Sequence, residues 1–123
     1  ALLVTHDPAE AALTADRMAV LQHGRIVQHD TPEQLFRRPV SEPAARLLGC
    51  VNVSPEYYVP PEAVLIGDER GIPVPVRACQ KQPALWRIVL QHPKWGELVC
   101  WHAQPVGDTC RAWVDEVQVV RFA

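Results

Sequence analysis

The placement of proline is the feature that most constrains what this chain can form. Proline supplies 12 of the 123 residues, about twice the average share of about 5%. Pro8, Pro32 and Pro43 stand where helices would begin, whereas most prolines from Pro55 onward separate short runs of strand-forming residues. The pattern changes between residues 49 and 55. We therefore predict two domains, residues 1–50 and residues 51–123.

The first domain opens with a strand pattern. Residues 1–5 (ALLVT) form an unbroken apolar run, which is typical of a strand buried in a parallel sheet. Asp7, Pro8 and Glu10 then have the spacing of a helix N-terminus, with Asp7 as its cap. Two further runs, residues 18–22 and 25–29, flank Gly24. Their spacing predicts a tight β-hairpin in which Gly24 adopts positive φ.

Two more helices follow in the first domain. Thr31 and Gln34 repeat the capping pattern and predict a helix through residues 36–38. Ser41 is the expected start of a third helix, which ends at Gly49. We expect that helix to bury four apolar residues: Ala44, Ala45, Leu47 and Leu48.

The second domain has a strand pattern throughout. Strand-forming runs recur at residues 57–59, 63–66, 72–79, 85–91, 97–101, 110–114 and 117–122. Several short strands at this spacing predict a small Greek-key barrel or sandwich, and about 70 residues suits a barrel of the OB type. The expected fold class is therefore α+β, a truncated α/β tail followed by a small all-β barrel.

The charge distribution argues against two classes of partner. The first 50 residues carry 5 basic and 6 acidic side chains and the remaining 73 carry 7 and 8. Neither half has the basic excess of a nucleic-acid-binding or anionic-membrane-binding surface. No apolar run is long enough to span a bilayer. Since the chain begins in mid-pattern without an initiating Met, we expect it to be a fragment.

The four cysteines have no metal-site spacing. Cys50, Cys79, Cys100 and Cys110 include no CxxC pair, so neither a zinc site nor a disulfide framework is indicated. Alternation along a strand would place Cys100 and His102 on one face. We expect reduced, mostly buried thiols in a cytosolic protein.

Several segments of the first domain together resemble a known family. They are residues 3–7 (LVTHD), 10–11 (EA), 15–21 (ADRMAVL), 24–28 (GRIVQ) and 31–35 (TPEQL). In this order and spacing they resemble the C-terminal end of the ATP-binding subunits of ABC importers, most closely the subfamily handling sulfate, molybdate, iron, polyamines or sugars. The proline-rich segment that follows is similar to the accessory β-barrel called TOBE. Its residues 59–64 (VPPEAV) echo an Arg-Pro-Glu stretch of that domain, with Pro60 in place of Arg.

The resemblance gives His6 a role. In this family, the histidine after the strand is the switch histidine, which contacts the terminal phosphate of ATP. The chemistry is reasonable, because a side chain at the carboxyl end of a parallel strand faces the ligand crevice of an α/β fold. Imidazole can also orient an attacking water beside a phosphate. Asp7 is expected to be a helix cap, and Asp16 with Arg17 a structural pair.

The catalytic set implied by the family is incomplete here. The sequence contains no GxxxxGK[ST] phosphate loop, the element that holds phosphates and Mg²⁺. ATP and Mg are therefore expected cofactors of the parent protein, and this chain alone should neither bind ATP usefully nor hydrolyse it. The resemblance implies a homodimer that works with membrane-spanning transporter subunits, without inserting into the membrane itself. It also implies a cytoplasmic protein, peripheral at the inner face of the membrane.

Two alternatives concern the barrel. It could sense a small oxyanion, although from Pro55 onward it offers one threonine (Thr109), no serine and only two lysines (Lys81 and Lys94). It could instead bind nucleic acid through its four tryptophans (Trp86, Trp95, Trp101 and Trp113), as OB-like barrels do. Because no basic groove accompanies these rings, we expect them to pack in the core or at an interface and not to stack on bases.

A last expectation concerns residues 1–5. If they form an interior strand without neighbours, the strand exposes unpaired backbone groups. We expect it to rearrange or to be covered by a second copy of the chain, giving a swapped or strand-paired dimer.

Overall fold

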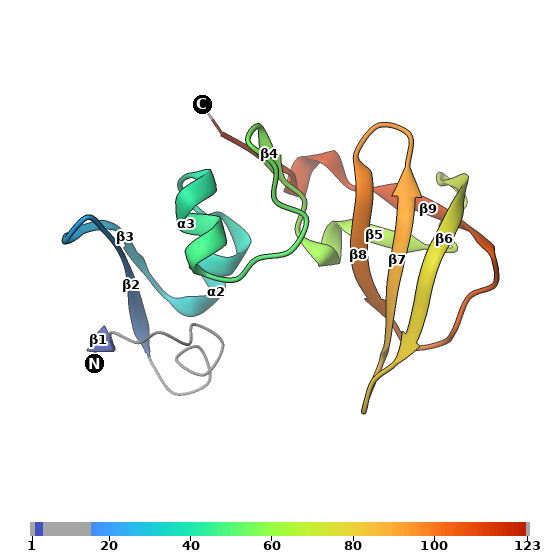
Figure 1. Cartoon of the computed structure of the whole chain (residues 1–123), viewed down its shortest axis with the longest axis horizontal. Coiled ribbons are helices and arrows are strands. Elements are labelled where there is room, and N and C mark those ends of the chain that lie inside the picture. The colour runs from blue at the N-terminus through green and yellow to red at the C-terminus, as the bar shows by residue number, and fades with distance from the viewer. Residues whose placement is uncertain (1, 4–15, 123) are drawn as a thin grey trace. The chain divides into compact units, whose positions relative to one another are not determined.

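The computed structural model describes residues 2–3 and 16–122 (Figure 1). Its contacts divide the chain into two compact units. Unit 1 comprises residues up to Tyr58 together with Val120 and the residues after it, and unit 2 runs from Val59 to Val119. The division into domains 1–50 and 51–123 stays a prediction.

Unit 1 contains a three-stranded sheet in the order β1-β2-β3. Strand β1 (Leu2–Leu3) pairs in parallel with β2 (Arg17–Gln22), and β2 pairs antiparallel with β3 (Arg25–Asp30). His23 and Gly24 both have positive φ, 53° and 75°, as a two-residue hairpin turn of this hand requires. The predicted hairpin and the parallel pairing of the first strand are confirmed. The predicted helix from Asp7 lies outside the described residues.

Two short helices of unit 1 begin at the predicted caps. Helix α2 (Pro32–Arg37) follows Thr31, and α3 (Glu42–Leu47) follows Ser41. The hydroxyl of Thr31 accepts from the Gln34 amide at 3.4 Å, and that of Ser41 accepts from the Ala44 amide at 3.3 Å. Each hydroxyl satisfies one of the amide groups that a helix start leaves without an intrahelical partner.

The burial of α3 differs from the prediction at one residue. Ala44, Ala45 and Leu48 are buried, but Leu47 is 52% exposed. At 100° per residue, Leu47 lies beyond the edge of the face that those three residues share. Gly49 has a φ of 75° and ends the helix as predicted. The core of unit 1 is Met18, Val20, Leu35, Ala44 and Leu48.

Unit 1 also includes a two-stranded antiparallel ladder. Strand β4 (Tyr57–Tyr58) pairs with β10 (Val120–Arg121). The predicted strand over residues 117–122 is therefore wrong in its first half. There Asp115 Oδ1 accepts from the Val117 amide at 3.2 Å and caps a 3₁₀ turn, η2 (Glu116–Gln118). That turn leaves Val117 81% exposed.

Unit 2 is a small all-β body. Its five strands are β5 (Val64–Ile66), β6 (Ile72–Lys81), β7 (Trp86–His92), β8 (Gly96–His102) and β9 (Thr109–Val114), preceded by the 3₁₀ turn η1 (Pro61–Ala63). All pairings are antiparallel, in the order β5-β9-β6-β7-β8 (Figure 1). The sheet curves as a half-barrel whose edges are β5 and β8. A small β domain is thus confirmed, and closure into an OB-type barrel stays a prediction.

The interior face of the half-barrel follows from strand register. Ile88 on β7 lies opposite Cys79 on β6 and Cys100 on β8, and Leu90 lies opposite Val76 and Leu98. Directly paired residues point to the same face of a sheet. Ile88, Leu90, Leu98 and Cys100 are almost completely buried, so this face forms the core of unit 2.

Candidate functional site

His6, the predicted switch histidine, and Asp7 lie outside the described residues. Their roles stay predictions. Arg17, which the sequence placed in a structural pair with Asp16, donates from Nε to His29 Nε2 at 3.4 Å. Since Ala19 lies opposite His29 in the ladder, this bond joins strand β2 to strand β3. Arg17 therefore has a structural contact with the neighbouring strand, and its expected pairing with Asp16 stays a prediction.

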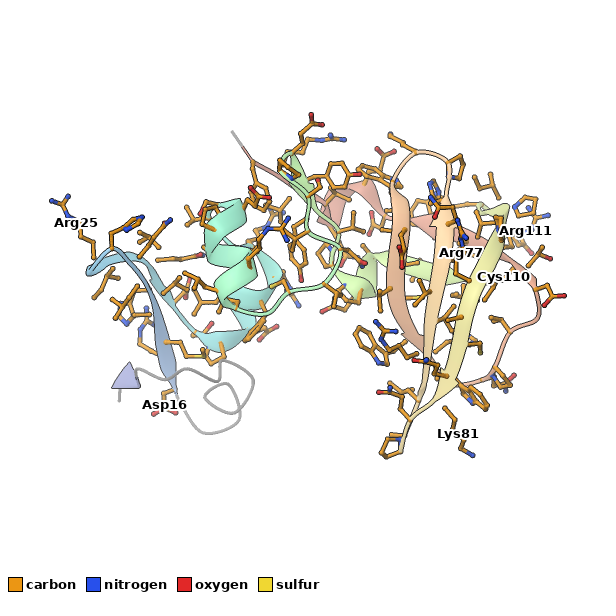
Figure 2. All side chains as sticks on the ribbon, viewed as in Figure 1. Asp16, Arg25, Arg77, Lys81, Cys110 and Arg111 are labelled. Atoms are coloured by element: carbon orange, nitrogen blue, oxygen red, sulfur yellow. The ribbon has the colours of Figure 1, made fainter. Side chains whose placement is uncertain are left out.

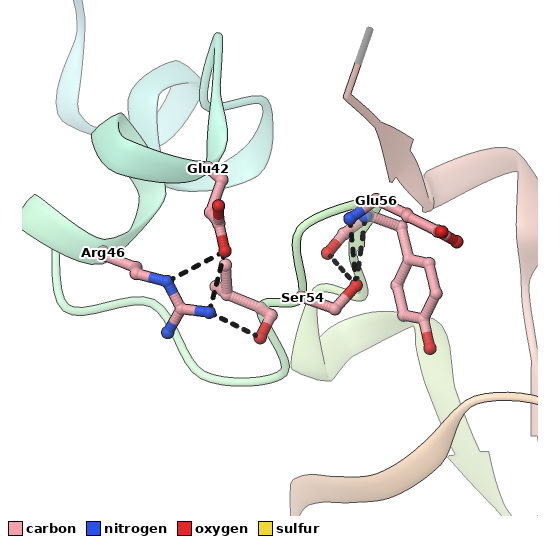
Figure 3. A network of polar contacts seen from close by, with 6 residues as sticks. Glu42, Arg46, Ser54 and Glu56 are labelled. Carbon is pink, nitrogen blue, oxygen red and sulfur yellow. Dashed lines mark hydrogen bonds and ion pairs between the residues drawn. The ribbon is translucent and has the colours of Figure 1, made fainter.

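A polar network holds the end of α3 and the segment that follows it (Figure 3). Arg46 donates to Glu42 Oε2 from Nε at 3.2 Å and from Nη2 at 2.9 Å, and Nη2 also lies 3.5 Å from the Val53 carbonyl. Ser54 Oγ accepts from the amides of Glu56 and Tyr57 at 3.4 and 3.2 Å. These contacts fix a chain reversal. They leave no group suited to a ligand.

Unit 2 contains an open cavity of about 440 Å³ between η1, β5 and the end of β8. This position is the open seam of the half-barrel, where its two edge strands approach each other. The lining combines the apolar residues Val64, Leu65 and Ile66 with Glu62, Asp68, Trp101 and His102. Ligand pockets share this combination of an apolar lining and a few polar groups, and their volumes are about 300–1,000 Å³.

The two carboxylates of the cavity differ in their partners. Asp68 accepts from Arg70 Nε at 2.9 Å and from Nη2 at 2.8 Å, and also from the Arg70 amide at 2.9 Å. These bonds from Arg70 lower the pKa of Asp68 to about 2, so Asp68 is ionised and already paired. Glu62 is exposed, and within residues 16–122 it has no hydrogen bond or ion pair.

Three of the four tryptophan rings make a cation–π contact with a Lys or Arg side chain of unit 2. The Arg70 guanidinium carbon is 3.6 Å from the centroid of Trp113, Lys94 Nζ is 4.9 Å from Trp95, and Lys81 Nζ is 5.9 Å from Trp86. Trp101 has no such contact with the described residues and is 39% exposed. The register places Trp86 and Trp101 on opposite faces of the sheet. The rings therefore do not form one stacking platform.

Cys100 and His102 lie on one face, as alternation predicted, because they pair with Ile88 and Trp86 of β7. In the described part of the chain, no three His, Cys, Asp or Glu residues converge as a metal site would require. All four cysteines are free thiols, but only Cys100 is buried and the other three are half-buried. The expectation of mostly buried thiols is corrected accordingly. Burial raises the pKa of the Cys100 thiol to about 12 and also raises that of Cys110.

The basic side chains of unit 2 do not gather around the cavity. Figure 2 shows Lys81 near one end of the sheet and Arg77 and Arg111 nearer the other, and Arg111 Nη1 is engaged with the Gly71 carbonyl at 2.7 Å. The cavity lining contains neither Lys nor Arg. Of the Lys, Arg, Asp and Glu residues, only the carboxylates of Glu62 and Asp68 line this seam, which gives the oxyanion alternative no support here.

Sequence reasoning did not find the seam. Glu62 and Trp101 are 39 positions apart, and only the curvature of the sheet brings their elements together. The one local signal was the turn-forming sequence at residues 67–71 (GDERG), which predicts a tight connection between strands but does not indicate a cavity.

Comparison with known proteins gives a consistent set of relatives. The chain is 39% identical over 95 residues to the Fe(3+) ions import ATP-binding protein FbpC of Streptomyces coelicolor, covering 75% of this chain and 25% of that protein. It is 45% identical over 69 residues to the glucose import ATP-binding protein GlcV of Saccharolobus solfataricus, covering 56% and 19%. It is 50% identical over 48 residues to FbpC of Serratia marcescens, covering 39% and 14%. No family model matches the chain.

This chain is homologous to the ATP-binding subunits of ABC importers. The resemblance predicted from residues 3–35 is thereby confirmed, and the half-barrel of unit 2 fits a TOBE-like domain. The matched regions span only about a seventh to a quarter of these importer subunits. No described helix of this ABC subunit homologue is both long and apolar enough to cross a membrane.

Proposed function

We propose that this chain works as the C-terminal part of the ATP-binding subunit of an ABC importer. The single observation that carries the proposal is the identity to importer subunits over 48–95 residues, together with the family landmarks between His6 and Leu35. In such a subunit, ATP and Mg²⁺ bind mainly to upstream elements. Residues 1–50 form the end of the nucleotide-binding domain, and residues 51–123 form the accessory barrel.

His6 is the residue of this chain that acts in the reaction. Placed after a parallel strand, its imidazole donates a hydrogen bond to the terminal phosphate of ATP and helps to orient the attacking water. Two subunits enclose the nucleotides, and their closure and reopening move the membrane-spanning subunits between inward and outward states. The subunit lies in the cytoplasm at the inner face of the membrane. The barrel contributes to dimer contacts or regulation.

The test uses the chain joined to its natural upstream sequence. That sequence must contain a phosphate loop and a signature segment, and without them the proposal fails at once. With them present, His6→Ala should lower the steady-state rate of ATP hydrolysis by at least about a hundredfold, with little change in ATP binding. His23→Asn, which alters an exposed histidine in the turn between β2 and β3 and keeps a residue type that tolerates the positive φ of this position, is the control and should retain most of the activity.

The homodimer is tested separately. Sedimentation of the 123-residue chain over a range of concentrations should show reversible dimerisation, because β1 pairs with β2 on one side and its other side exposes unpaired backbone groups. A monomer at every concentration would remove the dimer from the proposal without affecting the role of His6.

A further inference from the structure

The seam cavity of unit 2 has the chemistry of a cation site. We propose that it binds a small organic cation with an apolar stem, an alkylammonium or an alkylguanidinium group. The cation would lie between the Trp101 ring and the Glu62 carboxylate, with its stem against the apolar residues of β5 that line the cavity. This site is separate from ATP chemistry and does not depend on the role of His6.

Trp101 differs from the other tryptophan rings of unit 2. Trp86, Trp95 and Trp113 each hold a cation of the chain 3.6–5.9 Å from the ring centroid, within the distance of about 6 Å at which cation–π attraction acts. Trp101 is the ring in the cavity wall, and the described residues place no cation over it. Its face is therefore available to a ligand.

The cavity lining also carries net negative charge. Glu62 and Asp68 are the charged residues in the lining, and both are acidic. Arg70 neutralises Asp68 with two bonds of 2.8–2.9 Å while its guanidinium covers Trp113. Glu62 keeps an unbalanced negative charge and two acceptor oxygens. A carboxylate of this kind accepts charge-assisted hydrogen bonds from an ammonium or guanidinium group.

The cavity also offers apolar surface beside its carboxylates. Val64, Leu65 and Ile66 of β5 belong to its lining, with Leu65 on the opposite face of the strand from Val64 and Ile66. A stem of a few methylenes would pack against the apolar part of this lining. The volume of about 440 Å³ lies within the range of small-molecule pockets. A stem with a cationic head therefore fits better than a bare metal ion or an anion.

The test compares three ligands that share a stem and differ in the charge of the head: n-butylammonium, n-butanol and n-butyrate. Each is titrated into the 123-residue chain at neutral pH, and the indole N–H resonance of Trp101, assigned with Trp101→Phe, is followed by NMR. Butylammonium should give a saturable shift with a dissociation constant in the millimolar range, as small ligands do. Butyrate should give none, and butanol a much weaker one.

Two variants keep the proposal falsifiable. Glu62→Gln should weaken butylammonium binding by about five- to tenfold, and salt should weaken the wild-type interaction. Glu69→Gln is the matched control, because Glu69 is an exposed carboxylate of the adjoining turn and does not line the cavity. Equal responses to all three ligands, preference for butyrate, equal effects of the two Gln variants, or no saturation with butylammonium would each overturn the proposal.

Discussion

Gly71 packs directly against the backbone of Ala112. A Cβ added at Gly71 would lie 2.6 Å from the carbonyl carbon of Ala112 and 2.7 Å from its oxygen. Ala112 is on β9, opposite Ile72 of β6, and is itself 1% exposed. The connection from β5 to β6 therefore requires a residue without a side chain at position 71.

We predict that Gly71→Ala destabilises unit 2 by roughly 1–3 kcal/mol, because the clash is with the backbone of a paired strand and not with a flexible side chain. The measurement is chemical unfolding followed by tryptophan fluorescence, since all four tryptophans belong to unit 2. Gly107→Ala is the control. Its added Cβ meets no heavy atom within 4 Å, so its effect should stay within about 0.5 kcal/mol. Equal stability of the two variants would contradict the steric argument.

His92 makes the stability of unit 2 depend on pH. Its Nδ1 accepts from the amides of Lys94 and Trp95 at 3.1 and 3.3 Å, which requires the neutral ring. Burial, with a smaller effect of the Lys94 charge, lowers the pKa of His92 below its usual 6.5. Since the unfolded chain takes up a proton first as pH falls, the contribution of His92 is present above about pH 6.5 and is lost below it.

His92→Asn tests this dependence, because the amide oxygen can accept in place of Nδ1 and does not titrate. The melting temperature of the wild type should fall from about pH 7.5 to about pH 5.5 by more than that of the variant, because these values lie about one unit either side of the usual histidine pKa. Parallel pH profiles for the two proteins would show that His92 is not responsible.

The sequence predicted local structure well because local structure here has local causes. Thr31 and Ser41 cap helices through atoms three residues away, and Gly24 serves a two-residue turn. The errors occur where a local effect overrides the hydrophobic periodicity of the sequence. Leu47 is apolar but lies past the edge of the buried face, and the side chain of Asp115 diverts residues 116–118 into a 3₁₀ turn.

The candidate site was less predictable, for a physical reason. Arg70 and Trp113 are 43 positions apart, and only the order β5-β9-β6 brings them together. A single sequence does not reveal the register of distant strands. His6, in contrast, was predicted from a motif read along the chain, and that prediction awaits its test.

Arg70 controls the protonation of Asp68. Hydrogen bonds from the Arg70 side chain and amide are the main causes of the low Asp68 pKa of about 2. Arg70→Ala removes the side-chain bonds, so the pKa of Asp68 should rise toward its ordinary value of 3.8. The measurement is an NMR titration of the side-chain carboxyl carbons. Arg77→Ala, which removes an exposed arginine of β6, should leave the pKa of Asp68 unchanged, and an equal rise in both variants would point to net charge as the cause.

Cys100 should be the last thiol of the native protein to be alkylated. It is fully buried, and its pKa of about 12 leaves at neutral pH only about one thiolate in 10⁵ molecules, the form that reacts with iodoacetamide. Cys79 is half-buried on the neighbouring strand β6 and supplies the internal comparison. Mass spectrometry after short labelling should show modified Cys79 while Cys100 is unmodified, and labelling in denaturant should remove the difference. If Cys100 reacted as fast as Cys79 in the native protein, the half-barrel would have to open on the timescale of labelling, and the interior face assigned to Ile88, Leu90 and Cys100 would not be a stable core.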